Sequence, residues 1–409
     1  MALYEMEDAK ERVILVGVQE NDAEPEEESL DELAELARTA GAEVAGRLIQ
    51  KREAMHPVTY IGKGKILELK ELLWETDATG IICDDELTSV QLNHLEEELE
   101  CKIVDRTLLI LDIFAARAST NEGKIQVELA QLKYRQSRLT GYGTSLSRLG
   151  GGIGTRGPGE KKLEMDRRLI KGRIARLNRE LTEVKNHRQV AREQRKKEML
   201  PVIAIVGYTN AGKSTLLNYL TGAEVLAENK LFATLDPTTR GYQLGSGQKV
   251  LFTDTVGFIR KLPHHLIDAF RSTLEEAKYA DLILHVVDAS NPQMDEQMHI
   301  VYETLRGLGV QDKPVITVFN KQDLLTEPVI LRDFQADATV PISAATGAGI
   351  DALESKLEQV GEEKAELVRT LAASAEERDE LSETIEKLQN QKYELDIKNT
   401  RNENQLDTY

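Results

Sequence analysis

Residues 207–214 read Gly207-Tyr208-Thr209-Asn210-Ala211-Gly212-Lys213-Ser214, and Thr215 follows. They fit the pattern G-x-x-x-x-G-K-S, which joins a strand to a helix in P-loop proteins. The run before them (202–206) is apolar and β-branched, and the run after them (215–220) has a helical pattern. A glycine-rich turn without function is the alternative, and this strand and helix context disfavours it. The stretch predicts a phosphate-binding loop, in which Lys213 neutralises β/γ oxygens and the Ser214 hydroxyl coordinates Mg²⁺.

Three further motifs follow in the order that a guanine-nucleotide site requires. They are Asp254-Thr255-Val256-Gly257, Asn320-Lys321-Gln322-Asp323 and Ser343-Ala344-Ala345, each at the end of a strand-like run. Asp254 can reach the Mg²⁺ shell, and the Gly257 amide can approach the γ-phosphate. The Asp323 carboxylate can accept from guanine N1–H and N2–H, which adenine does not offer, so the sequence predicts GTP or GDP rather than ATP. The serine motif, whose backbone amide would contact guanine O6, is the weakest of the set.

A switch segment is expected between the first two of these motifs. It reads Phe232-Ala233-Thr234-Leu235-Asp236, followed by Pro237, Thr238 and Thr239. One threonine of such a segment completes the Mg²⁺ shell and senses the γ-phosphate. We choose Thr234, and Thr238 and Thr239 stay alternatives. The predicted metal ligands are therefore Ser214, Thr234 and Asp254, and the predicted catalytic groups are Lys213, Thr234 and the Gly257 amide.

The residue after Gly257 predicts slow turnover. Ras-type enzymes have a glutamine there to position the attacking water, whereas this chain has Phe258, which has no hydrogen-bonding side chain. We expect Mg²⁺-dependent hydrolysis of GTP that a partner accelerates. Asn210 resembles the asparagine of potassium-dependent GTPases, so K⁺ near Asn210 is the second expected cofactor.

The chain has 409 residues, of which 41% are hydrophobic, which is enough for two or three domains. No apolar run has the length of a membrane span, and the acidic residues 1–8 do not resemble a signal peptide, so we expect a cytoplasmic protein. Cys83 and Cys101 have no neighbouring His or Cys, which favours small buried residues over a metal or disulfide role.

The predicted fold class of the chain is α/β. Four segments are expected, and the fourth is the tail described below. Residues 1–110 alternate strand-like and helix-like patterns, which predicts a small parallel sheet with helices; Ser29 and Glu32 form a candidate capping box for its first helix. The glycines and lysines of residues 60–65 are interpreted as a structural turn rather than a second phosphate site. Residues 111–199 predict a helical hairpin with a glycine-rich tip at 141–159, and residues 200–360 a G domain with a mixed, mostly parallel sheet covered by helices on both faces.

Charge is distributed unevenly. The chain has a net charge of −18, yet residues 133–199 contain nineteen Lys and Arg against seven Asp and Glu, so this segment carries +12 and the rest −30. A basic segment in an acidic protein indicates a directed contact with nucleic acid. Arg148 and Arg156 in the tip are the candidate RNA-binding residues, since arginine pairs with phosphate and glycine permits close backbone approach. A flexible linker is the alternative, although linkers usually lack such arginines.

Residues 361–409 form a polar, heptad-like tail. Its apolar seam consists of Leu367, Leu371, Leu381, Ile385, Leu388 and Leu395, interrupted by Ser374, Arg378 and Lys392. A coiled coil is the prediction, with a solvated helix or a disordered tail as alternatives. The sequence does not decide the oligomeric state; we expect a monomer in solution.

With these motifs in view, the chain resembles the HflX family of GTPases, part of the Obg-HflX superfamily. The resemblance covers about residues 13–360, and its most specific parts lie outside the G motifs, at 60–65, 105–107, 122–132 and 150–160, with 232–237 and 254–259 also family-like. It implies an α/β N-terminal subdomain, a helical hairpin and a G domain. The polar tail departs from the family pattern, so family contacts made through that terminus are not carried over.

The resemblance also implies binding to the large ribosomal subunit and its RNA, with the hairpin tip directed toward the peptidyl-transferase region, and splitting or rescue of stalled ribosomes under stress. Two alternatives stay open. One is a GTP-dependent RNA-binding factor for large-subunit assembly. The other is a switch that associates weakly with anionic membranes or with a protein partner, which would place it at the membrane periphery.

Overall fold

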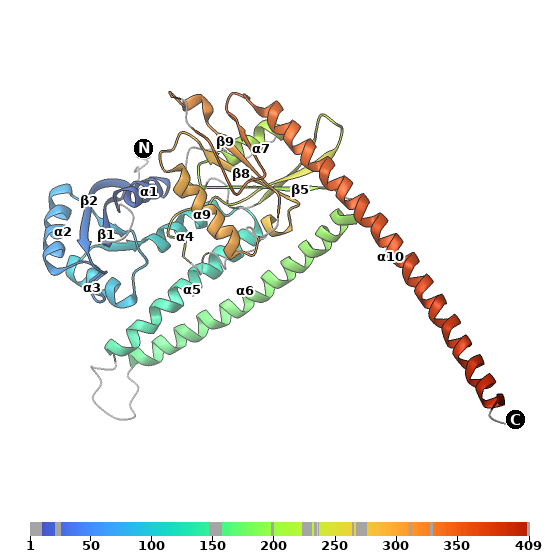
Figure 1. The fold of residues 1–409 in the computed structure, drawn as a ribbon. Coiled ribbons are helices and arrows are strands. Elements are labelled where there is room, and N and C mark those ends of the chain that lie inside the picture. The colour runs from blue at the N-terminus through green and yellow to red at the C-terminus, as the bar shows by residue number, and fades with distance from the viewer. Residues whose placement is uncertain are drawn as a thin grey trace, which may run out of the picture. The chain divides into compact units, whose positions relative to one another are not determined.

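The fold was analysed in a computed structural model (Figure 1). It describes residues 10–20, 26–146, 158–197, 200–222, 231–232, 235, 237–263, 266, 276–310, 313–327 and 330–406. The backbone divides into two compact units, of which the first holds residues 1–243 and 247–350 and the second residues 244–246 and 351–409.

The first unit begins with a four-stranded parallel sheet. Its strands are β1 (Arg12–Glu20), β2 (Glu43–Arg52), β3 (Gly80–Cys83) and β4 (Lys102–Asp105), in the order β2-β1-β3-β4. The connecting helices are α1 (Glu26–Thr39), α2 (Lys63–Thr76) and α3 (Ser89–Leu99), and α4 (Arg106–Arg117) follows β4. Separate apolar clusters pack on the two faces of this sheet. Because both faces are covered, β1 and β3 are buried along most of their length. The predicted small parallel sheet is confirmed.

Two local predictions in this region have different outcomes. The capping box is wrong: α1 begins at Glu26, which places Ser29 and Glu32 inside the helix, where both bond to groups distant in sequence. The interpretation of residues 60–65 as a turn is only partly right, because the turn lies at residues 57–59 and residues 63–65 are the start of α2. Tyr60 is buried with φ of 65° and pairs with His56, and Gly62 caps α2.

The helical hairpin consists of α5 (Asn121–Leu146) and α6 (Pro158–Lys197), which lie side by side in Figure 1. An apolar cluster made by Ile125, Leu129, Leu177 and Leu181 joins them. The predicted hairpin segment, 111–199, starts inside α4, and the helix is interrupted at residues 118–120 between α4 and α5. Helix also continues farther into the predicted tip than expected, because α5 extends to Leu146 and α6 starts at Pro158.

The second sheet of this unit has six strands in the order β10-β9-β8-β5-β7-β6. They are β5 (Val202–Gly207), β6 (Thr238–Gln243), β7 (Lys249–Asp254), β8 (Leu282–Asp288), β9 (Val315–Asn320) and β10 (Ala338–Pro341), with α7 (Lys213–Thr221), α9 (Met294–Gly307) and the 3₁₀ helix η1 (Gln322–Leu324) between them. Only β6, among the described strands, runs antiparallel to its neighbour. The predicted mixed, mostly parallel sheet is confirmed.

Helix α10 (Ile350–Leu406) forms most of the second unit. It is continuous through residue 360, where the sequence suggested that the last helix of the G domain ends. Within this unit the Glu358 carboxylate accepts a hydrogen bond from the Ser246 backbone at 2.6 Å. Among the described residues, none of the helices has the length and apolarity to cross a membrane.

Candidate guanine-nucleotide site

The loop between β5 and α7 has a backbone that requires glycine. Gly207 and Gly212 have φ of 152° and 94°. A Cβ on Gly207 would lie 2.1 Å from the Val286 carbonyl oxygen, and one on Gly212 would lie 2.2 Å from the Asn320 amide nitrogen. The loop can therefore pass close to β8 and β9 while Gly212 caps the start of α7. This geometry turns the first amides of α7 toward the place where phosphates bind in P-loop proteins.

Lys213 is the cation of this loop. It is buried, and its ammonium donates to the Tyr208 carbonyl at 2.7 Å and to the Gly207 carbonyl at 3.2 Å. Burial lowers the pKa of Lys213 to about 8, although the charge of Asp254 acts in the opposite direction. A negatively charged phosphate near the ammonium would favour its protonated form.

The predicted metal ligands lie together where the structure describes them. The Ser214 hydroxyl donates to a carboxylate oxygen of Asp254 at 2.7 Å, and Asp254 is fully buried. A hydroxyl and a carboxylate are hard oxygen ligands, which suit Mg²⁺. Thr234 lies outside the described residues, as do Ala233 and Asp236. Of its competitors, Thr238 and Thr239 lie in β6, and the Thr239 hydroxyl is 3.0 Å from that of Thr253.

Asn320 connects three of the predicted motifs. Its side-chain amide donates to the Ala211 carbonyl at 2.9 Å, and its side-chain oxygen accepts from the Ala344 backbone N–H at 2.9 Å. Asn320 is buried, whereas Asp323 is exposed and accepts a hydrogen bond from the Ser343 hydroxyl at 2.5 Å. The fold thus brings together the phosphate loop, the residues predicted to read guanine and the serine motif.

The segment after Asp254 is bonded directly to the phosphate loop. A Cβ on Gly257 would lie 2.7 Å from the Cα of Thr209, so only glycine fits there without movement. The Thr209 N–H donates to the Phe258 carbonyl at 2.8 Å, and the Phe258 N–H donates to the Gly207 carbonyl at 3.2 Å. The Phe258 ring is buried in the apolar core, which leaves no polar side chain at this position to hold a water.

A buried polar cluster links this segment and the phosphate loop to the N-terminal sheet. The Tyr208 hydroxyl donates to the Glu32 carboxylate and accepts from the Arg260 N–H at 2.9 Å. Arg106, buried at the start of α4, donates to Glu32, to Asp84 at 2.6 Å and to the Arg260 carbonyl at 3.2 Å. Burial raises the pKa of Glu32, against the opposing charge of Arg106.

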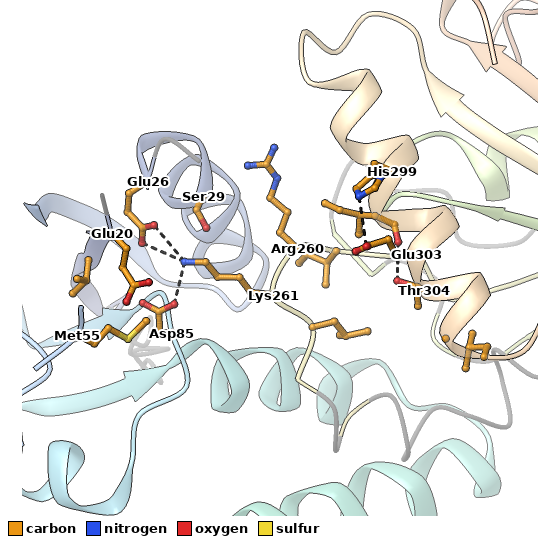
Figure 2. Close-up of a pocket in the computed structure, with 16 residues that line it drawn as sticks. Glu20, Glu26, Ser29, Met55, Asp85, Arg260, Lys261, His299, Glu303 and Thr304 are labelled. Atoms are coloured by element: carbon orange, nitrogen blue, oxygen red, sulfur yellow. Dashed lines mark hydrogen bonds and ion pairs between the residues drawn. The ribbon is translucent and has the colours of Figure 1, made fainter. Parts of the chain in front are cut away.

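Lys261 is held at the carboxyl ends of β1 and β3. Its ammonium lies 2.5 Å from an oxygen of Asp84, 3.1 Å from Asp85 and 3.4 Å from Glu26, and Figure 2 shows it between Glu26 and Asp85. Its φ of 49° is unusual for a residue with a side chain. Together with Arg260 it lines a cleft of about 930 Å³, which α9 borders on the other side (Figure 2).

Apolar contacts strengthen the same connection. Phe232 of the expected switch segment packs edge-to-face on Phe114 of α4, with ring centroids 4.7 Å apart. Val256 and Ile259 belong to the same apolar cluster as Leu30 of α1. The expected switch segment and the segment after Asp254 therefore share apolar clusters with the helices of the N-terminal sheet, an arrangement that the sequence reasoning missed. Its sequence signals were the family-like stretches 105–107, 232–237 and 254–259, of which 105–107 carried no assigned role.

The structure describes part of the basic hairpin. Arg148 and Arg156 lie outside the described residues. Arg173, one of the basic residues of α6, pairs with both oxygens of Glu128, at 2.6 and 2.9 Å. Lys171 and Arg179 are exposed on α6. The exposed charges, rather than Arg173, are thus the candidates for non-specific phosphate attraction.

Comparisons with known proteins agree with this geometry. Residues 27–115 match a family described as GTP-binding GTPase N-terminal, residues 117–195 match GTP-binding GTPase Middle Region, and residues 202–321 match 50S ribosome-binding GTPase. GTPase HflX of Lacrimispora saccharolytica is 65% identical over 358 residues, which are 88% of this chain and 85% of the relative. GTPase HflX of Caldanaerobacter subterraneus is 56% identical, covering 86% and 80%, and that of Escherichia coli is 43% identical, covering 86% and 83%.

Proposed function

The chain belongs to the HflX family of GTPases, and from this premise we propose that it hydrolyses GTP to act on the large ribosomal subunit and to split or rescue stalled ribosomes under stress. The observation that carries the proposal is the combination in one unit of the four predicted guanine-nucleotide motifs, each at the end of a strand, with a basic helical hairpin. The matched family description, a 50S ribosome-binding GTPase, supports the choice of partner.

The residues of the site suit hydrolysis by water. Lys213 and the amides at the start of α7 would bind the phosphates, and Gly257 would offer its amide to the γ-phosphate. Ser214 and Asp254, with Thr234 as the proposed switch ligand, would hold Mg²⁺, which when bound neutralises charge on the β- and γ-phosphates. Asp323, exposed beside Ser343, would accept hydrogen bonds from the guanine base.

We expect slow intrinsic turnover, because the buried Phe258 ring cannot position a water. A ribosome would supply the missing ordering by changing the conformation of the switch segment. Asn210 has φ of 61° and lines a hollow together with Asp288 and four acidic residues of α1: Glu28, Asp31, Glu32 and Glu35. This electrostatic setting suits a monovalent cation. K⁺ is therefore proposed as a second cofactor. Equal hydrolysis rates in KCl and NaCl at equal ionic strength would remove K⁺ from the mechanism.

The decisive experiment is a sedimentation profile of intact ribosomes mixed with the protein. With GTP, or with a non-hydrolysable analogue, 70S particles should decrease and separate subunits should increase. Intact 70S particles that carry the protein would instead indicate binding without splitting. Exclusive association with large-subunit precursors would favour the assembly factor, and salt-sensitive association with anionic vesicles the membrane-linked switch.

The hairpin has its own test. Replacing residues 147–157 by a short turn should leave basal GTP hydrolysis intact, because the helices still pair through Leu129 and Leu177. The shortened protein should no longer split ribosomes if the tip contacts RNA. Reversing Lys171 and Arg179 should mainly weaken binding and reduce its salt dependence. Unchanged splitting by the shortened protein would show that the hairpin is only a spacer.

A further inference from the structure

Helix α10 presents an apolar seam to solvent in the part of the chain that the nucleotide site does not use. Leu381, Ile385, Leu388 and Leu395 are 57%, 54%, 58% and 59% exposed. Their spacings of four, three and seven residues place them on one stripe with a repeat of 3.5 residues. A single solvated helix gains nothing from such a stripe, whereas a helix that pairs with another buries it.

Charge on α10 is arranged around this seam. The positions that flank it on either side are uncharged in the central two heptads: Ser382, Thr384, Gln389 and Gln391. Charged residues such as Asp379, Glu383 and Glu386 lie on the remaining surface, and all of these positions are exposed. From Leu381 to Gln391 no charged residue lies in the seam or on its borders, a separation that a helix stabilised only by solvation does not require. The division into seam, neutral flanks and charged back indicates a helix partner rather than water.

We propose that α10 pairs with the α10 of a second copy of this chain as a parallel, in-register coiled coil. In this register Leu381, Ile385, Leu388 and Leu395 each face their own counterpart. The flanking positions bring no like charges together there, because the heptad positions place Gln391 of one copy beside Asp396 of the other.

An antiparallel pair fits less well. If Ile385 faced Leu388, then Leu381 would face Lys392 and Leu395 would face Arg378, so only the central layers would be apolar. In the parallel pair the two Lys392 side chains share one layer and the two Arg378 side chains share another, where their stems can pack and their charged ends reach water. A lysine at such a position costs stability and fixes the register. The proposal replaces the expectation of a monomer with a dimer that forms in a concentration-dependent way.

The test uses sedimentation velocity of the full chain between about 1 and 100 µM, a range that covers dissociation constants of weak to moderate affinity. The sedimenting mass should change from one chain to two across this range. Ile385→Glu should weaken the association at least about a hundredfold, because a dimer loses two buried side chains and gains two facing carboxylates. The matched control is Ile397→Glu, the same substitution on the same helix outside the seam, and it should associate as the unchanged chain does.

Orientation is tested with Leu395→Cys under mild oxidation. In the parallel pair the two introduced thiols lie in one layer and should form a disulfide between copies. In the antiparallel pair they would lie about 25 Å apart along the axis and should not. The chain with only Cys83 and Cys101 shows the background, and equal basal GTP hydrolysis in all variants shows that the rest of the fold is intact.

Three results would overturn the proposal. The chain could stay monomeric up to the highest concentration. It could dimerise equally well with Ile385→Glu, which would place the interface elsewhere. It could dimerise through α10 without the Leu395→Cys crosslink, which would exclude the parallel register.

Discussion

Removing one hydroxyl should show how strongly the phosphate loop depends on the N-terminal sheet. In Tyr208→Phe the buried ring stays, but the hydrogen bond to Glu32 and the one from the Arg260 N–H at 2.9 Å are both lost. Glu32 keeps Arg106 as a partner, so its charge is not left alone. The Arg260 N–H, in contrast, is left buried without this acceptor.

The magnitude follows from these two contacts. A hydrogen bond to a charged group contributes about 1.5–3 kcal/mol and a neutral one about 0.5–1.5 kcal/mol. Together they predict a loss of about 2–4 kcal/mol in the free energy of unfolding, a large share of the about 5–15 kcal/mol typical of proteins. Affinity for GTP should fall as well, because Tyr208 belongs to the phosphate loop and Arg260 follows the Gly257 segment.

Denaturant unfolding followed by fluorescence and circular dichroism measures the first effect, and nucleotide titration measures the second. A cycle with Glu32→Gln separates the Tyr208–Glu32 coupling, since neighbours that interact directly are not additive. Tyr393→Phe, in the exposed part of α10, is the matched control and should change stability by less than about 0.5 kcal/mol. The same small change in Tyr208→Phe would refute the reasoning, and additive effects of the two cluster variants would remove the direct coupling.

Three further predictions concern single residues. Asn320→Ala should cost about 2–4 kcal/mol in unfolding free energy and nearly abolish GTP binding, because the Ala211 carbonyl and the Ala344 N–H both lose their partner; an unchanged calorimetric affinity would contradict this. Asp323→Asn should shift preference from GTP to xanthosine triphosphate, since an amide donates where the carboxylate only accepts, and unchanged GTP affinity would rule out its role with the base. Burial raises the pKa of Glu26 to about 8, so its contribution to stability is complete below pH 4.5, decreases as pH rises and is lost above about pH 8; unfolding at pH 6 and 8.5 should show a decline that Glu26→Gln reduces.

The sequence alone was sufficient to predict the two sheets and the order of the guanine-nucleotide motifs. These features depend on short stretches. The phosphate loop, for example, depends on Gly212 with its positive φ, on Lys213 directly after it, and on the apolar run 202–206 before the loop. Each such stretch restricts its own backbone, so its meaning can be read without knowing its neighbours in space. The apolar runs of β1, β3, β5 and β8 are likewise visible in the sequence, and in the structure β1 pairs in parallel with β3 and β5 with β8.

Only the tertiary structure decided what Ser29 and Glu32 do. Their spacing fits a capping box, but α1 starts three residues before Ser29, and the two side chains bond to Asp84 and to Tyr208, which is 176 residues from Glu32. Likewise, Lys261 meets Asp84 from 177 residues away. Local patterns carry no information about such pairs, because a buried charge is stable wherever packing brings it a partner, and packing depends on the whole chain.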